Sequence, residues 1–346
     1  MGAIQFAEQA TGVRVNEQGR ALARAAVAAL AAPSILNTQP WRWRISGNVA
    51  ELRADDSRKV DSLDPDARLL VLSCGIALHH ARVALAAEGV RVEVAYLPDD
   101  GDGEGPLATI RYTGKVEIGS EARRLRRAMA TRHTDRRPFA DTPVPDSTLE
   151  ELRHAAESAG AHLHLPRSED IVTLTVAAGH AASAERADPA YLAELAEWVR
   201  RADGGTDGVP VTTTVPSAAR PVPIREFVAD GVDRSTVHDG LTLVDRHARY
   251  AVVFTDGDTQ RDWLAAGEAL SAILLTATVN GLATSPMSDL VEVASSRALL
   301  RAMLAAVGYP AIVVRIGLPA TIDAPVPAAP RRAPAEVIEF ERATSD

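Results

Sequence analysis

The sequence predicts an α+β protein in which two related halves each place a mixed β-sheet against flanking helices. Three observations lead to this fold class. The length of 346 residues is enough for one large core or two ordinary ones. An apolar helix occurs twice along the chain, and short segments rich in valine and isoleucine surround each copy. We place the boundary between the halves near Ile118, which divides the chain into 1–117 and 118–346.

The repeated helix spans residues 74–89 in the first half and 266–281 in the second. Each copy has a glycine at its second position and another at its last position. Apolar side chains recur between these glycines at helical spacing. A glycine directly after such a stretch is typical of a helix C-cap. We therefore expect two equivalent buried helices.

The strands are predicted from two patterns. Residues 90–96 and 108–112 alternate between apolar and other side chains, as strands with one buried face do. Residues 250–254 and 311–316 are short apolar runs of the kind found in strands buried on both faces. An alanine-rich helix is expected at 20–31, before the first strands.

Composition excludes several classes of protein. The formal net charge is −9, and no basic run is interleaved with aromatic residues, so we expect no nucleic-acid partner. The single cysteine, Cys74, makes no disulfide framework and no cysteine-based metal site. No basic secretory segment opens the chain, and no uninterrupted apolar run reaches the roughly 20 residues that span a bilayer. We expect a cytoplasmic protein without a membrane partner and without a metal.

The first polar motif follows the alanine-rich helix. It comprises Pro33, Ser34, Asn37, Thr38, Gln39, Pro40 and Trp41. Side-chain amides and hydroxyls beside free backbone N–H groups suit a flat heterocycle with carbonyl and imide edges, such as an isoalloxazine. The alternative is a polar turn that is stabilised by its own side-chain-to-backbone hydrogen bonds.

Two arginine-rich motifs lie in the second half. They contain Arg132, His133, Thr134 and Arg136 in the first, and Arg331 and Arg332 in the second. Forked guanidinium donors suit a phosphate group and the pyrimidine edge of a flavin. The alternatives are a solvated basic turn for the first motif and a disordered tail for the second.

Together these motifs resemble those of nitroreductases. Residues 33–41 are similar to the flavin-binding loop of that family, and 132–136 look like the Arg-x-Ser-x-Arg motif that opens its chains. Residues 281–334 are similar to its closing segment. In ordinary nitroreductases, one subunit gives the loop and its identical partner gives the arginines. Here the two halves would divide these roles, as in the Acg-type subfamily, so the resemblance implies a nitroreductase-like fold and an intramolecular pseudo-dimer.

Each half lacks one of these motifs. The first has no Arg-x-Ser-x-Arg motif before Pro33, and the second has only a poor echo of the flavin loop at 216–219. The resemblance therefore implies one FMN per chain. The segment 203–220 is rich in glycine, threonine and proline, and it stands where a second flavin loop would be. It looks like a lid over the single site.

The function that the resemblance implies is an FMN-dependent oxidoreductase. It would reduce nitro, quinone or other electron-poor small molecules, with NAD(P)H as the candidate electron donor. The alternative is an FMN-sequestering or storage protein with a lidded site and little NAD(P)H-driven turnover. Flavin-borne chemistry demands no catalytic side chain. Because the fused halves already complete a dimer-like fold, we expect a monomer or a weak homodimer.

The resemblance also divides the candidate site residues by role. Asn37 and Thr38 from the first half, with Arg132 and Arg136 from the second, are expected at the flavin ring. Donors there would stabilise the anionic reduced flavin. The pair 331–332 is expected to hold the phosphate.

Overall fold

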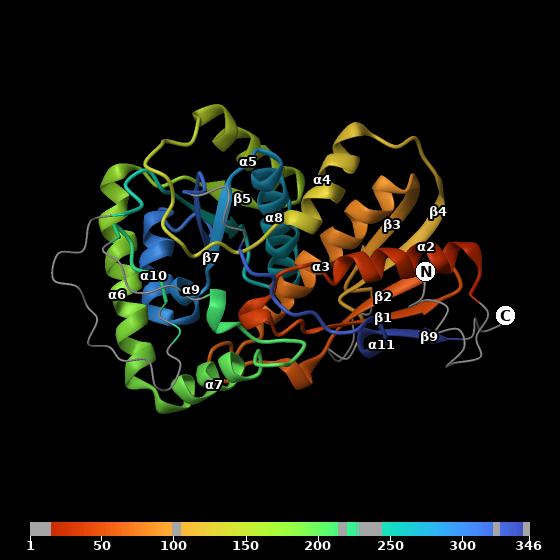
Figure 1. The fold of residues 1–346 in the computed structure, drawn as a ribbon, viewed down its shortest axis with the longest axis horizontal. Helices are drawn as coiled ribbons and strands as arrows, with labels where there is room; N and C mark the ends of the chain where they lie inside the picture. Colours follow the sequence, from red (N-terminus) through yellow and green to blue (C-terminus); the bar gives the residue numbers. More distant parts are fainter. Residues whose placement is uncertain are drawn as a thin grey trace.

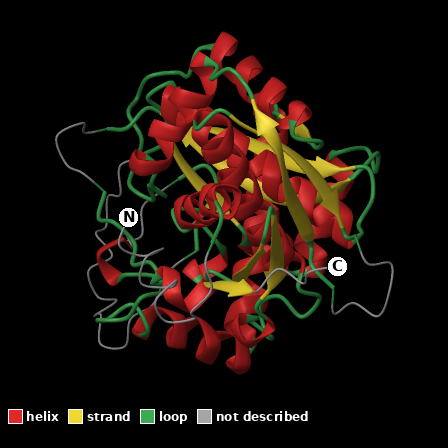
Figure 2. Cartoon of the chain, turned by 90° about the vertical axis from the view of Figure 1, so that its right-hand side faces the viewer, coloured by secondary structure: helices red, strands yellow, loops and turns green. Residues whose placement is uncertain are grey.

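The computed structural model describes residues 15–98, 105–213, 220–225, 227, 244–320 and 326–341. The strands form two separate sheets (Figure 1). Figure 2 shows the strands and the helices packed against one another, seen from the side of the first sheet. The architecture is the α+β arrangement of sheets and flanking helices that the sequence predicts, although within the described residues only the first sheet is mixed and the second is antiparallel.

The first sheet has the strand order β3-β4-β2-β1-β9. Its members are β1 (Trp41–Ser46), β2 (Val49–Ala54), β3 (Val90–Tyr96), β4 (Ala108–Lys115) and β9 (Ile338–Glu341). The first four strands pair antiparallel, whereas β9 pairs parallel to β1, with Trp43 opposite Ile338. The end of the chain therefore completes a sheet that its beginning builds.

The second sheet has the order β7-β8-β6-β5, and all its pairs are antiparallel. Its members are β5 (His162–His164), β6 (Arg249–Thr255), β7 (Ala283–Met287) and β8 (Tyr309–Gly317). Apart from β9, the first sheet has the same order and the same pairing sense. In both sheets a long helix joins the third strand in this order to the first. The two halves thus share one topology.

Those two helices are α3 (Arg68–Ala87) and α8 (Gln260–Val279), which pack together at the centre of the molecule (Figure 1). They cross at Gly75 and Gly267. A Cβ atom on Gly75 would lie 2.2 Å from the backbone oxygen of Leu264, and one on Gly267 would lie 2.0 Å from that of Leu72. The crossing is therefore reciprocal, and only glycine permits so close an approach on either side.

The predicted helix ends agree with the structure, but the predicted starts do not. Gly89 and Gly281 follow the two helices with φ values of +69° and +70°, as expected for glycine C-caps. Both helices begin about six residues before the predicted starts. The residues added to the first helix are 68–73, of which all but Arg68 are buried, so a continuous apolar run obscures its start. The alanine-rich helix is α2 (Glu17–Ala29), which Asn16 caps at 2.7 Å from the N–H of Gly19.

The remaining helices cover the sheets and connect them. They are α4 (Ser120–Thr131), α5 (Asp146–Ser158), α6 (Ile171–Ala187), α7 (Pro189–Arg200), α9 (Asp289–Glu292), α10 (Ala294–Met303), α11 (Pro334–Val337) and the short 3-10 helices η1 (Ile35–Asn37), η2 (Asp56–Arg58), η3 (Ser168–Asp170) and η4 (Val211–Thr213). The helix α4 contacts both α3 and α8. The strand β9 pairs with β1 of the first sheet. The boundary near Ile118 is therefore a position along the chain, and elements from either side of it pack together.

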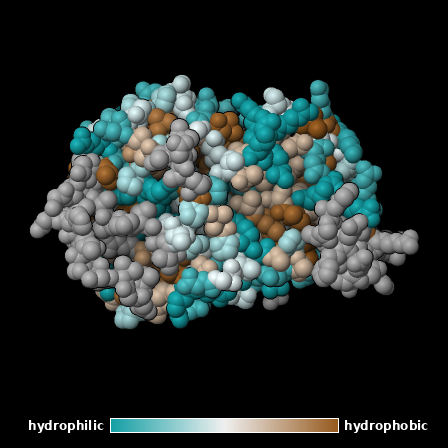
Figure 3. All heavy atoms as spheres, viewed as in Figure 1, coloured by the Kyte–Doolittle hydropathy of each residue, from teal (hydrophilic) through white to brown (hydrophobic). Residues whose placement is uncertain are grey.

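By length and composition alone, α3 and α8 are apolar enough to cross a membrane. However, the most apolar part of each is mostly buried in this fold, 83% for α3 and 67% for α8. Figure 3 shows a largely hydrophilic surface on the face it presents, with hydrophobic atoms in small areas. Core packing therefore accounts for the apolar character of both helices.

Candidate cofactor site

The predicted flavin loop, residues 33–41, has an unusual backbone. Leu36, Asn37 and Gln39 all adopt positive φ angles, of 43°, 56° and 50°. Each such residue costs of the order of 1–3 kcal/mol unless its surroundings enforce the conformation. Two serine hydroxyls help to enforce it, since Ser34 Oγ accepts from the N–H of Gln39 at 2.8 Å and Ser73 Oγ accepts from that of Ile35 at 3.1 Å.

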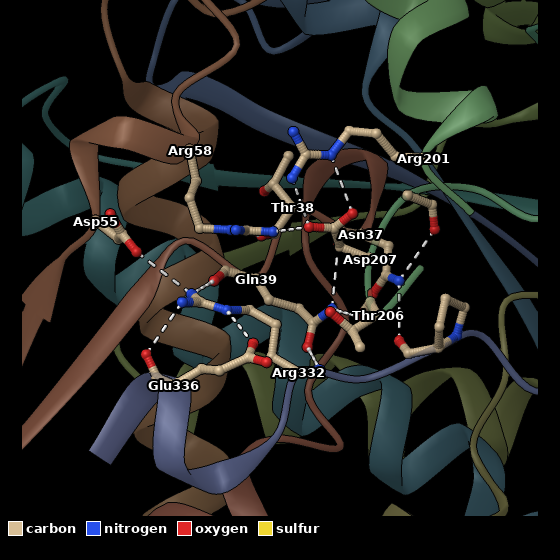
Figure 4. A network of polar contacts seen from close by, with 12 residues as sticks. Asn37, Thr38, Gln39, Asp55, Arg58, Arg201, Thr206, Asp207, Arg332 and Glu336 are labelled. Atoms are coloured by element: carbon tan, nitrogen blue, oxygen red, sulfur yellow. Dashed lines mark hydrogen bonds and ion pairs between the residues drawn. The ribbon is translucent and has the colours of Figure 1, made fainter. Parts of the chain in front are cut away.

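The second half holds the side chains of this loop (Figure 4). Asn37 Nδ2 donates to the carbonyl oxygens of Gly208 and Pro330, both at 3.0 Å. Its Oδ1 accepts from Arg331 at 2.7 Å. Gln39 Nε2 donates to the carbonyl of Thr206 at 2.9 Å. Both amides therefore join the two halves across the site, a role that the sequence did not reveal.

Arg332 also belongs to this framework (Figure 4). Its guanidinium forms an ion pair with Asp55 at 3.3 Å and donates to the carbonyl oxygens of Gln39 and Glu336. Its own N–H donates to Gln39 Oε1 at 2.9 Å. Arg332 is 7% exposed and Asp55 is 4% exposed, so the pair is enclosed by protein. Arg332, which we predicted to hold the phosphate, therefore lies in this enclosed framework and lines neither of the cavities described below.

Two cavities lie where the halves meet, with volumes of about 100 and 90 Å³. They share Pro33, Ser34, Leu36, Thr134 and Arg136 in their walls, so they adjoin. The structure thus brings the flavin loop and both arginine motifs around one space.

The predicted residues divide into those that line this space and those that support it. The smaller cavity is also lined by Asn37, Arg132, His133 and Arg331. Five predicted residues line neither cavity, namely Thr38, Gln39, Pro40, Trp41 and Arg332. All five are buried.

The smaller cavity concentrates positive charge without a counterion. Arg132 is 6% exposed, and its Nε and Nη1 atoms have no hydrogen-bond partner in the described part of the chain. Burial, together with the charge of Arg331, lowers the pKa of Arg132 to about 9. Burial also lowers the pKa of Arg331 to about 10, and it lowers the pKa of His133. Such desolvated cations are stabilised by an anion between them.

Arg136 stands where the two cavities meet. Burial, followed by repulsion from Arg225 and Arg315, lowers its pKa to about 10. Its guanidinium lies 4.7 Å from the centroid of the Phe227 ring and donates weakly to Thr213. These contacts leave much of its donor capacity facing the cavity.

The larger cavity is mainly apolar at its base and polar at one end. Its apolar walls come from α3, α8 and the second sheet, and include Leu69, Leu72, Ile76, Leu270, Met287 and Ile312. Its polar end contains Arg225 and Asp289. Neither residue could be predicted as a site residue from the sequence, because only tertiary packing brings 225 and 289 to one wall. No motif marks either position.

The predicted lid is described for residues 203–213 and 220, while 214–219 lie outside the described residues. Its described part is attached to the flavin loop. Asp207 forms ion pairs with Arg58 and Arg201 and is 6% exposed. Gly208, Val209 and Pro210 line the smaller cavity. Part of the segment therefore lines that cavity, and the ion pairs of Asp207 attach it to Arg58 and Arg201 (Figure 4).

The internal repeat would create a second crevice equivalent to the one that contains the two cavities. The side chains at that second position are chemically different. Counted from the crossing glycines, Arg261 and Glu268 in α8 stand where α3 has the cavity residues Leu69 and Ile76. Two apolar wall positions are thus replaced by charged residues.

Both charged residues contact side chains of the first half. Glu268, 1% exposed, forms an ion pair with Arg82 and accepts from the Tyr96 hydroxyl at 2.8 Å. Arg261 lies 3.5 Å from the centroid of the Tyr96 ring. Side chains of this chain thus fill the position that corresponds to the wall of the larger cavity.

Comparison with known proteins identifies the class. The sequence profile of the nitroreductase family matches residues 129–317, which is more than half of the chain. The chain therefore belongs to the nitroreductase family. The match covers most of the second half, which contains the arginine motifs and the second sheet.

Two relatives from Mycobacterium tuberculosis match over both halves. The chain is 37% identical over 314 residues to "Putative NAD(P)H nitroreductase Rv3131", covering 90% of this chain and 89% of that protein. It is 33% identical over 307 residues to "Putative NAD(P)H nitroreductase acg", covering 87% and 90%. The likeness to these relatives thus extends to the first half, which carries the flavin loop.

Solved structures that resemble this chain share less sequence identity with it than these relatives do. They include the nitroreductase NfnB from Mycobacterium smegmatis in complex with NADPH, at a TM-score of 0.39 and 17% identity, covering 64% of this chain and 100% of that one. Another is a nitroreductase with bound FMN from Bacteroides fragilis, at a TM-score of 0.38 and 13% identity, covering 60% and 95%.

Proposed function

We propose that this chain binds one FMN in the two adjoining cavities and acts as an NAD(P)H-dependent oxidoreductase on electron-poor small molecules. The phosphate would lie in the smaller cavity, and the isoalloxazine would extend into the larger one. The observation that carries this proposal is Arg132, a buried guanidinium with unpartnered donors beside a second cation, Arg331. A dianionic phosphate offers the acceptors and the charge that this pair lacks.

The shape of the larger cavity supports the same assignment. A flat tricyclic ring needs apolar walls on its faces and a few polar groups at its edge. The leucine and isoleucine side chains of α3 and β8 supply such walls, while Ser34, Thr134 and Arg136 supply polar groups. The FMN would supply hydride and electron transfer, and the protein would position it and exclude water.

Asn37, Gln39 and Arg332 then have a supporting role in this proposal. They fix the strained loop against the second half, so the backbone of residues 33–36 is presented to the cofactor in one conformation. Asp55 keeps the Arg332 guanidinium in place. These residues would affect FMN affinity through the position of the loop.

The test is the visible spectrum of the purified protein, followed by extraction and identification of the chromophore. We expect FMN, and we expect Arg132→Ala to reduce its retention strongly. The matched control is Arg127→Ala, which removes an exposed arginine from the neighbouring helix α4. Colourless protein that takes up no FMN on reconstitution would overturn the proposal.

A second candidate function is FMN sequestration with little turnover. It is favoured by one observation, the fastening of Asp207 to Arg58 and Arg201 beside the smaller cavity. Anaerobic mixing with NADPH separates the two functions. Bleaching of the flavin band within seconds supports the oxidoreductase, whereas reduction by dithionite alone supports sequestration.

A further inference from the structure

One carboxyl group on the wall of the larger cavity has no part in the proposed cofactor site. Asp289 begins α9, directly after the cavity-lining residues Ser285–Ser288, and it lines the cavity itself. It is only 6% exposed. Within the described residues, its carboxyl has neither an ion pair nor a hydrogen bond to another side chain.

The neighbouring arginine is already occupied. Arg225, which also lines the cavity, forms ion pairs with Glu185 of α6 at 3.1 Å and with Glu292 of α9. The hydroxyl of Tyr191, from α7, donates to Glu292 Oε2 at 2.7 Å. Two carboxylates thus share one guanidinium, and Asp289 is left as an additional acidic group in an enclosed space.

We propose that Asp289 is the proton donor to the substrate reduced in the larger cavity. This proposal rests on the proposed function, because the reduced flavin supplies the electrons. For a quinone, the substrate gains a hydride from the flavin, and one oxygen gains the proton from the Asp289 carboxyl. The O–H bond of the acid breaks, a carboxylate forms, and a proton from solvent restores the acid.

The surroundings of Asp289 favour a group that holds a proton near neutral pH. Burial raises the pKa of Asp289 to about 7, against the opposing attraction of Arg225, and Glu185 and Glu292 raise it further. Although burial disfavours the charge of Arg225, Glu292, Tyr191 and Glu185 together raise its pKa, so it stays cationic. A general acid is most effective when its pKa lies near the working pH.

This role defines a class of substrate. Acceptors whose oxygen must be protonated on reduction, such as quinones and nitroaromatics, would use Asp289. Acceptors that take only electrons, such as ferricyanide, would not. The two classes therefore serve as a matched pair of substrates for a single variant.

The experiment measures reoxidation of the pre-reduced holoenzyme in a stopped-flow instrument between pH 5.5 and pH 8.5, limits chosen to lie roughly equally on both sides of the donor pKa. We expect Asp289→Asn to slow reoxidation by p-benzoquinone on the order of 100-fold at the acidic end. The wild-type rate should fall as the pH rises through about 7, and the variant should lose this dependence. Reoxidation by ferricyanide should be unchanged. The control Asp256→Asn alters an exposed carboxyl and should match the wild type.

A second measurement does not depend on turnover. Infrared difference spectra of the flavin-free protein, titrated through pH 7, should show a protonated carboxyl band that Asp289→Asn removes. If FMN binds and p-benzoquinone is reduced but the variant keeps the wild-type rate and pH profile, the role of Asp289 is overturned and the proposed function stands. If no FMN binds, both fail. If ferricyanide slows equally, Asp289 supports the site and donates no proton.

Discussion

Two adjacent arginines, Arg331 and Arg332, have separate surroundings despite their shared position after Pro330. Arg331 lines the smaller cavity and reaches Asn37, whereas Arg332 is enclosed with Asp55 beneath the flavin loop. A difference of one residue on an extended loop turns the side chain to the other face. Single variants therefore separate ligand binding from folding.

We expect Arg331→Ala to weaken FMN binding with little loss of stability. A charge-assisted hydrogen bond contributes roughly 1.5–3 kcal/mol, which corresponds to roughly 10- to 150-fold in dissociation constant. Fluorescence titration of the apoprotein with FMN measures this change. Unchanged affinity would remove Arg331 from the phosphate site.

Arg332→Ala should instead destabilise the protein, by about 1–3 kcal/mol, because it removes the buried ion pair with Asp55 and the hydrogen bonds to the Gln39 and Glu336 carbonyls. Arg42 and Ser57 still contact the Asp55 carboxylate in this variant. Urea unfolding of the flavin-free protein measures this loss. A variant with wild-type stability and weak FMN binding would restore the phosphate role that the sequence predicted.

The raised pKa of Asp289 also predicts a pH effect on stability. An unfolded aspartate loses its proton near pH 4, whereas folded Asp289 keeps it until about pH 7. The folded state therefore binds more protons in this interval, and stability should fall as the pH rises from about 4 to about 7. Asp289→Asn should flatten that part of the profile in thermal unfolding of the apoprotein. An unaltered slope would contradict the raised pKa.

At the scale of elements, the crossing of α3 and α8 depends on Gly75 and Gly267. A methyl group at either position would overlap a backbone carbonyl oxygen of the opposite helix. Since backbone cannot turn aside as a flexible side chain can, the helices would have to move apart. Both cavities are lined in part by these helices or by the loop packed on α3.

We expect Gly75→Ala and Gly267→Ala each to destabilise the protein by about 1–3 kcal/mol or more. Gly179→Ala is the matched control, because it lies in α6 with no atom within 4 Å of the added methyl group. That substitution should stabilise the protein by roughly 0.5–1 kcal/mol, the usual effect of alanine in a helix. Equal effects in denaturant unfolding at all three sites would show that the crossing tolerates a methyl group.

The central helices and the segments that meet at the site could be predicted from the sequence, but most contacts within the site could not. Glycine spacing predicted both central helices, since their C-caps depend on local backbone angles at 89 and 281. The polar motifs predicted which segments meet around the cavities. The partners of Gln39 and Arg332, and the placement of Arg225 and Asp289 on one wall, depend on contacts between distant segments. Local patterns do not contain such contacts.

At the scale of the whole molecule, the two halves share a topology but not a surface chemistry. One crevice has cavities and unpartnered arginine donors, and at the other the cluster of Glu268, Arg82, Tyr96 and Arg261 fills the corresponding position. We interpret the chain as a fused pair of nitroreductase-like halves of which one crevice is retained for a ligand.

This interpretation predicts a stoichiometry of one FMN per chain. Reconstitution with excess FMN, removal of the free flavin and measurement of flavin against protein should give a ratio near one. A ratio near two would show that the crevice containing Glu268 still binds. The same preparation, passed through a light-scattering column, gives the mass of the assembly and tests whether the chain is a monomer or a weak homodimer.

The parallel strand β9 has a consequence for how the molecule is made. It is the last described segment of the chain, yet it forms the edge of the sheet that the first hundred or so residues build, and Arg331 lies just before it. During synthesis, the N-terminal half leaves the ribosome long before its edge strand exists. The β1 edge of the sheet is thus open to incorrect pairing until residues 338–341 have been synthesised. Cofactor loading would then follow the synthesis of this late segment, and a nascent chain stalled before residue 330 would hold no flavin.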